Sequence, residues 1–168
     1  MSKKGTPKRQ RFRCILAHLP LLGMLLAGCS REPPPVVADL HFPVAVLFSN
    51  SSAIRYDNAA DLGVMPVQLV INSKFPPILI DSQFNILTLQ KLSSIHGGLW
   101  LMVHPSGNTE VAFDLKRAPK SGLDAARSAM RAQLDMQDWR TDLDQRRTTL
   151  ATQTTLPGML TLLQDAAE

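Results

Sequence analysis

The sequence predicts an α+β domain in which an antiparallel sheet of four or five strands is followed by C-terminal helices packed on one of its faces. Short runs of β-favouring apolar residues, separated by Pro, Asn and Ser, occupy the chain from about residue 43 to residue 116. Helical periodicity begins at about residue 121. Because strands precede helices and do not alternate with them, a doubly wound parallel sheet is not expected.

Four short apolar runs predict the first strands. Residues 44–48 and 67–71 are rich in β-formers and are bounded by Pro, Ser and Asn. Residues 78–80 follow a Pro-Pro break, and residues 86–89 are expected to continue the sheet. Between the first two runs, residues 57–62 are expected to form a short helical turn.

The clearest local pattern predicts a β-hairpin over residues 99–115. Residues 99–104 and 109–115 resemble strands, and the Pro-Ser-Gly-Asn sequence between them suits a four-residue turn. This register places Trp100 opposite Phe113. Since the first of the two strands is apolar on both faces, we expect it inside the sheet, with the second nearer an edge.

The last third of the chain predicts helices with a break near Asp135. Ser121 and Asp124 have the spacing of a capping box at a helix start. Two apolar stripes follow on nearly opposite sides of the helical wheel: Leu123, Ala126, Met130 and Leu134 form the first, and Met136, Trp139, Leu143 and Leu150 form the second. One straight helix cannot bury both stripes against one sheet, so a break is favoured over a helix that lies between two apolar layers. Residues 154–158 are expected to end the helical region, with a final docked turn over residues 159–164.

The positive charge of the chain is confined to its N-terminus. The chain has 18 Lys and Arg against 14 Asp and Glu, for a formal charge of +4. Six of the basic residues precede Cys29 and no acidic residue does, so basic residues are outnumbered from Cys29 onward. Nucleic acid is therefore not an expected partner.

The N-terminus has the pattern of a secretory signal, with a basic segment before the mostly apolar residues 14–28. This stretch is too short, and too interrupted by His18 and Pro20, to span a bilayer. It ends Leu26-Ala27-Gly28-Cys29, which resembles the lipobox of bacterial lipoproteins. The resemblance implies a diacylglyceryl group on the Cys29 sulfur, cleavage before Cys29 by a lipoprotein signal peptidase, and acylation of the new amino terminus.

The same resemblance implies a location and a domain organisation. Ser30, rather than Asp, after the cysteine implies sorting to the outer membrane, on its periplasmic side. We expect a signal peptide over 1–28, a lipidated Pro-rich tether over 29–39 and a single periplasmic domain over 40–168. Three successive prolines favour an extended tether of about 30 Å. Since Cys14 leaves with the signal and Cys29 is lipidated, no disulfide, thiolate metal site or cysteine nucleophile is expected.

The histidines predict neither catalysis nor a metal site. His104, Ser106 and Asp114 supply the residue types of a Ser-His-Asp triad, but no G-x-S-x-G turn presents the serine. His96, His104 and Glu110 lack the short spacing of metal ligands. No Gly-rich phosphate loop is present.

The carboxylates give one weak catalytic candidate. Four aspartates between residues 135 and 144 are interleaved with arginines, which indicates a solvated helix face. Asp81, directly after the apolar residues 78–80, has the surroundings that a glycosidase acid needs. A turn residue at a strand end is the favoured interpretation of Asp81. We therefore expect no catalytic residue, no cofactor and no metal.

Trp139 is the predicted partner-binding anchor, with Arg146 and Arg147 as a charged rim, because Trp and Arg are enriched where interfaces are strongest. Core packing of Trp139 is the alternative. The predicted function is a non-enzymatic binding or accessory component of a cell-envelope assembly, with the membrane and another envelope protein as partners. Two alternatives stay open: a periplasmic inhibitor or immunity protein against a cell-wall-degrading toxin, and an envelope hydrolase.

Overall fold

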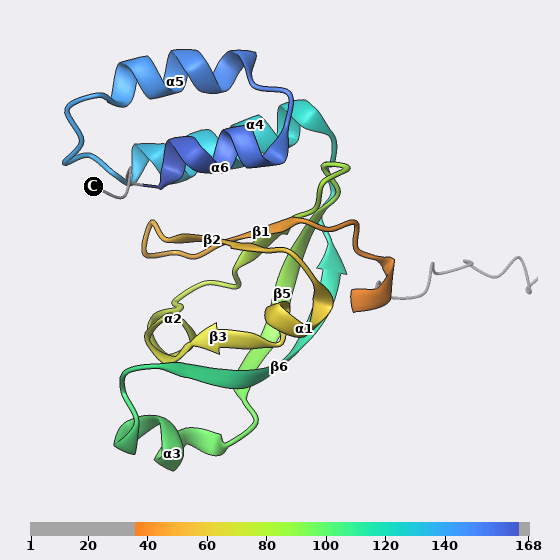
Figure 1. Cartoon of the computed structure of the whole chain (residues 1–168), viewed down its shortest axis with the longest axis vertical. Coiled ribbons are helices and arrows are strands. Elements are labelled where there is room, and N and C mark those ends of the chain that lie inside the picture. Colours follow the sequence, from red (N-terminus) through yellow and green to blue (C-terminus); the bar gives the residue numbers. More distant parts are fainter. Residues whose placement is uncertain (1–35, 165–168) are drawn as a thin grey trace, which may run out of the picture. The chain divides into compact units, whose positions relative to one another are not determined.

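The computed structural model describes residues 36–164, apart from the side chains of Leu99 and Met102. The predicted signal peptide, the lipobox and Cys29 lie outside these residues. The α+β class is confirmed, since an antiparallel sheet is followed by helices that pack on it (Figure 1). Its six strands exceed the four or five that we predicted. No helix within residues 36–164 has the length and apolar character needed to cross a bilayer.

The strands follow the order β2-β1-β4-β5-β6-β3, and each pair of neighbours is antiparallel. They are β1 Val44–Leu47, β2 Ala53–Tyr56, β3 Val64–Pro66, β4 Ile78–Ile80, β5 Ile86–Ser94 and β6 Asn108–Arg117. Four short helical elements precede or connect them: the 3-10 turn η1 Val37–Asp39, α1 Ala59–Leu62, α2 Val67–Asn72 and α3 Gly97–Val103. The C-terminal helices are α4 Leu123–Asp135, α5 Leu143–Thr152 and α6 Leu156–Leu163.

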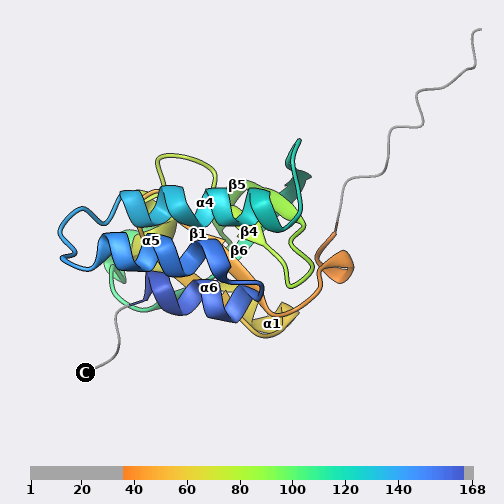
Figure 2. The same cartoon turned by 90° about the horizontal axis from the view of Figure 1, so that it is seen from above.

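The sheet separates two apolar clusters, and β1 contributes to both. Val44 and Val46 lie in a cluster that α1, α2 and β3 cover. Ala45 and Leu47 lie in the cluster that α4 and α6 cover. The helices α4 and α6 pack against this second face, and α5 lies on their outer side (Figures 1 and 2). Burial on both faces explains why β1 is a continuous apolar run and not an alternating one.

The domain begins earlier than the sequence indicated. Residues 37–39, which we assigned to the tether, form η1, and Val37 packs against the first apolar cluster. Leu40 is buried in the same cluster. Residues 37–39 therefore belong to the folded domain and not to the predicted tether.

The predicted strand over residues 67–71 is wrong, because this segment is the helix α2. A mostly apolar run of five residues cannot be assigned to strand or helix from its periodicity alone. Here the tertiary contacts favour the helix. The Val67 N–H donates to the Gly107 carbonyl at 3.0 Å, and Leu69 is buried in the first apolar cluster.

The predicted hairpin over residues 99–115 is also wrong in its first half. Only its second half is a strand, β6, which lies next to the three-residue edge strand β3, in agreement with the predicted position nearer an edge. β6 pairs with β5 over residues 111–117 and with β3 over residues 108–110, so both of its partners come from parts of the chain other than residues 99–104. Those residues form most of α3 instead, which Gly97 enters with a φ of 78°. Trp100 therefore does not oppose Phe113.

The break predicted near Asp135 is confirmed, because α4 ends at Asp135. The capping box is wrong: the N-cap residue is Gly122, with φ of 100°, and the Ser121 hydroxyl accepts from the Ile86 N–H at 3.2 Å. Residues 154–158 do not end the helical region. They begin α6, with Thr155 as the N-cap residue and Pro157 in the first turn, where proline is well tolerated.

Tyr56, the single tyrosine of the chain, gives the first prediction. Its side chain is buried, its hydroxyl has no hydrogen-bond partner within residues 36–164, and burial raises its pKa from 10.0 to about 12. The folded protein keeps the phenolic proton between these values while the unfolded chain loses it. The free energy of unfolding is therefore not reduced by this group below pH 10. It falls by on the order of 2–3 kcal/mol as the pH rises from 10 to about 12.

The measurement is urea unfolding across this pH range, together with the phenolate absorbance of the folded protein. Tyr56→Phe should abolish this part of the pH dependence and stabilise the protein by about 1 kcal/mol, because a buried unpaired hydroxyl is removed. A folded-state titration near pH 10 would contradict the burial argument.

Candidate binding surface

The loop between α4 and α5, residues 136–142, presents an indole to solvent. Trp139 is 64% exposed, so the core-packing alternative for this residue is wrong. Met136, at the start of the same loop, is 43% exposed. Large apolar side chains that stay exposed in a well-packed domain often mark contact sites.

The loop is held in place by Gln137, which is only 3% exposed. Its Nε2 donates to the carbonyl of Ser51, in the β1–β2 turn, at 3.1 Å and to the carbonyl of Leu163, at the end of α6, at 3.2 Å. Gln133, one turn earlier in α4, donates to the carbonyls of Phe48 and Ser52 at 2.9 and 3.1 Å. The base of the loop is therefore joined to the sheet and to the last helix.

Sequence reasoning missed these two glutamines, although one signal was present. Gln133 and Gln137 fall on the same helical side as Ala126 and Met130, which are buried against the sheet. A polar residue on a buried stripe needs hydrogen-bond partners. Their positions therefore indicated that both side chains need hydrogen-bond partners inside the domain, although the sequence could not show which ones.

Arg146 fastens α5 to α6. Its Nη1 donates to the Leu162 carbonyl at 2.6 Å and to the Gln164 carbonyl at 3.2 Å, and its Nε donates to Asp142 Oδ2 at 2.6 Å. The hydrogen bond from Arg146 lowers the pKa of the Asp142 carboxyl. The Arg146 side chain is 17% exposed, so most of its surface is used inside the domain.

Arg147 joins the end of α4 to the start of α5. Its guanidinium contacts Asp135 at 2.8 Å and Asp144 at 2.9 Å, and the side chain is 31% exposed. The acidic cluster of the sequence is therefore partly a set of ion pairs between helices. A rim role for Arg146 and Arg147 stays a prediction, and both also hold the helices that flank Trp139.

Asp81 occupies the turn between β4 and β5 and is 1% exposed. Its carboxylate accepts from the Gln83 N–H at 3.0 Å, the Asn85 N–H at 2.8 Å, the Asn85 Nδ2 at 2.9 Å and the His41 N–H at 3.4 Å. These bonds match the turn-residue interpretation of Asp81.

Two of the three residues of the Ser-His-Asp pattern, His104 and Asp114, have other partners in the structure. The His104 ring stacks on Trp100, with ring centroids 4.7 Å apart, and His96 contacts the same indole at 4.8 Å. Asp114 pairs with Lys91 at 2.7 Å. Within residues 36–164 no three His, Cys, Asp or Glu side chains are grouped as metal ligands.

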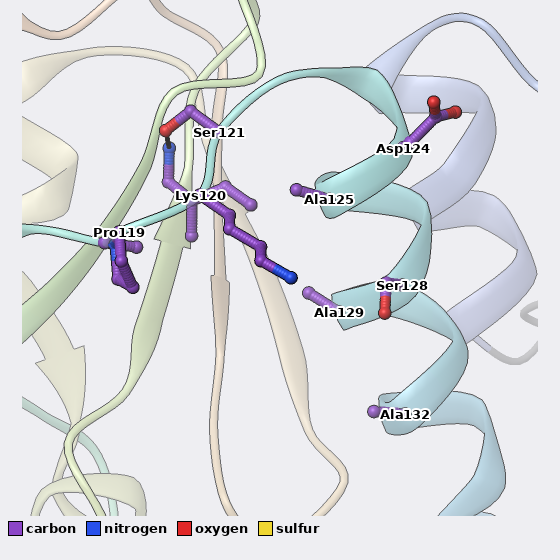
Figure 3. A pocket seen from close by; sticks show the side chains of 10 residues that line it. Pro119, Lys120, Ser121, Asp124, Ala125, Ser128, Ala129 and Ala132 are labelled. Carbon is purple, nitrogen blue, oxygen red and sulfur yellow. Dashed lines mark hydrogen bonds between the residues drawn. The ribbon is translucent and has the colours of Figure 1, made fainter.

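A groove of about 840 Å³ lies between α4 and the β6–α4 connection (Figure 3). Its α4 wall combines Asp124 with four small residues, Ala125, Ser128, Ala129 and Ala132. Lys120 extends from the connection toward α4, and Ser121 bonds the Ile86 N–H at the far wall. Neither Asp81 nor His104 lines this groove or the two smaller pockets of about 210 and 320 Å³.

No protein-family model, curated protein or solved structure matches the chain.

Proposed function

We propose that the chain is an outer-membrane lipoprotein, anchored through Cys29 on the periplasmic side, which binds another envelope protein through the α4–α5 loop. Its role is that of a non-enzymatic, accessory component of a cell-envelope assembly. The lipobox and the Pro-rich segment after it support the anchoring. The observation that carries the binding role is the exposure of Trp139 on a loop that buried hydrogen bonds hold in place.

The arrangement suits an interface anchor for a physical reason. Loss of conformational freedom opposes binding, and a loop already fixed by Gln137 has less freedom to lose. A buried Trp removes about 150–250 Å² from water, and the 64% of Trp139 that is still exposed corresponds to about 2–4 kcal/mol at 25 cal/mol per Å². This is the range of interface hot spots.

A tether further favours binding over catalysis as the role of such a domain. Attachment to the membrane raises the effective concentration of the domain near other membrane-bound proteins, so even a modest intrinsic affinity suffices. An inhibitor of a cell-wall-degrading toxin would use the same kind of surface, and the identity of the partner separates the two roles.

Trp139→Ala tests the proposal. The tagged full-length protein is expected to retain a specific envelope protein from native membranes, and the substitution should weaken that binding by about 30-fold or more. Stability should change by less than about 0.5 kcal/mol, because the side chain is exposed.

The matched control is Gln145→Ala, an exposed position of α5, which should bind the partner as the unsubstituted protein does. Equal retention of the partner by Trp139→Ala would refute the proposed surface. A partner that degrades the cell wall, inhibited on binding, would select the inhibitor role.

A further inference from the structure

The helix α3 forms an apolar projection at the end of the domain away from α4, α5 and α6 (Figure 1). It joins β5 to β6 and packs mainly against β5. Ile95, just before the helix, is 61% exposed, and Val103, its last residue, is 68% exposed. Between them the half-buried Trp100 lies against the rings of His96 and His104.

Two more exposed apolar side chains lie on α2 and just after it. Gln68 Nε2 donates to the Pro105 carbonyl at 2.7 Å, which ties α2 to the turn after α3. Ile71, at the end of α2, is 50% exposed, and Phe75, shortly after it, is 70% exposed. We call the set Ile71, Phe75, Ile95, Trp100 and Val103 the apolar end.

The charges around the apolar end indicate what it contacts. No Asp, Glu, Lys or Arg occurs between Lys91 and Glu110, so the whole α3 segment is uncharged apart from its histidines. Lys74 and Lys91 line a small pocket together with Phe75, and the Lys91 side chain, which pairs with Asp114 at 2.7 Å, is 82% exposed. Apolar side chains with a tryptophan beside them and lysines at the margin suit the boundary between acyl chains and anionic headgroups.

The chain outside the structure also favours a bilayer. Only six residues lie between Cys29 and Val36, and the seven Cα–Cα steps that join them can span at most about 25 Å when fully extended. This limit on the distance between the domain and the membrane rests on the proposed anchoring through Cys29. A domain held that close to a membrane can reach the lipid with one of its ends, and the apolar end is the one whose chemistry fits.

We infer that the apolar end is a second membrane contact, in which α3 inserts apolar side chains into a phospholipid surface while Lys74 and Lys91, the latter still paired with Asp114, lie at the headgroups. The domain then rests on the bilayer with its α2–α3 end, and the α4–α5 loop stays in the aqueous phase. Trp100 and Trp139 accordingly have different surroundings, lipid for the first and water or protein partner for the second.

The two tryptophans of the chain make the test direct. The lipidated full-length protein is reconstituted into phosphatidylethanolamine–phosphatidylglycerol vesicles whose acyl chains carry bromine, which quenches indole on contact. The Trp139→Phe protein, with Trp100 as its only indole, should lose roughly half of its fluorescence, since interfacial side chains reach the acyl boundary. The Trp100→Phe protein should not be quenched.

Val103→Asp and Ile95→Asp, added to the Trp139→Phe protein, should restore its fluorescence, because a carboxylate opposes insertion. Both positions are exposed, so the fold should be retained, which circular dichroism checks. Vesicle flotation and intact mass report the anchoring separately.

Flotation without quenching of Trp100 overturns the membrane contact and leaves the anchoring intact. Quenching of Trp139 in place of Trp100 overturns it as well, since the opposite end would face the lipid. A photoreactive side chain at position 103 that labels a protein in native membranes and no lipid contradicts it in favour of a protein contact. Failure to float refutes the anchoring, and this inference falls with it.

Discussion

Asp81→Ala is expected to lower the free energy of unfolding by about 3 kcal/mol, the largest effect of any single substitution considered for this chain. The carboxylate is buried and accepts hydrogen bonds from two backbone N–H groups of its own turn and from the Asn85 side chain. A fourth, longer bond from the His41 N–H joins the turn to the segment before β1. Alanine leaves these donors unpaired in a mostly buried site.

Urea unfolding measures the effect, with Asp144→Ala as the control. The Asp144 side chain is 97% exposed, so its loss should change stability by less than about 0.5 kcal/mol. Asp81→Asn, which keeps one acceptor oxygen, should fall between the two. Unchanged stability in Asp81→Ala would contradict the structural role. Turnover of peptidoglycan that is lost in a folded Asp81→Asn protein would instead favour the hydrolase alternative.

Gln137→Ala is expected to lower the free energy of unfolding by about 2 kcal/mol and also to weaken partner binding, although Trp139 is retained. The stabilisation comes from Nε2, because Oε1 has no partner within the described residues. Alanine releases the α4–α5 loop from the Ser51 and Leu163 carbonyls. Trp139 must then be ordered at the moment of binding, which reduces the affinity.

Two measurements separate the effect of Gln137→Ala on stability from its effect on partner binding. Urea unfolding gives the stability, and the affinity for the captured partner is measured at a temperature where the variant is fully folded. Gln145→Ala, exposed on α5, should alter neither quantity. Full affinity in a destabilised Gln137→Ala protein would show that the loop needs no fixing, and the argument from preorganisation would be wrong.

The elements that sequence reasoning predicted correctly are those whose pattern and packing agree. The apolar β1 and β4 runs lie in the middle of the sheet, and the α4 stripe of Ala126, Met130 and Leu134 packs on one face. The errors concern short apolar segments. Residues 67–71 and 99–104 carry β-favouring residues yet form helices, and β6 pairs with β3 and β5 instead.

The two edge strands were missed for the opposite reason. Ala53–Tyr56 has only four residues and Val64–Pro66 only three, so neither stands out in the sequence, and pairing with β1 and β6 defines them. The sequence identified Trp139 as a candidate anchor, but its exposure follows from the Gln137 hydrogen bonds, which join residues far apart in the chain. Such long-range partners leave no periodic signal.

Site-specific photo-crosslinking in living cells tests the central claim, that the anchored domain binds an envelope protein through the α4–α5 loop. A photoreactive amino acid replaces the exposed Asp138, next to the intact Trp139, and in a second strain it replaces the exposed Gln145. We predict a light-dependent adduct with one envelope protein from position 138, abolished by Trp139→Ala and absent from position 145. No adduct from position 138, or equal adducts from both positions, would contradict the claim.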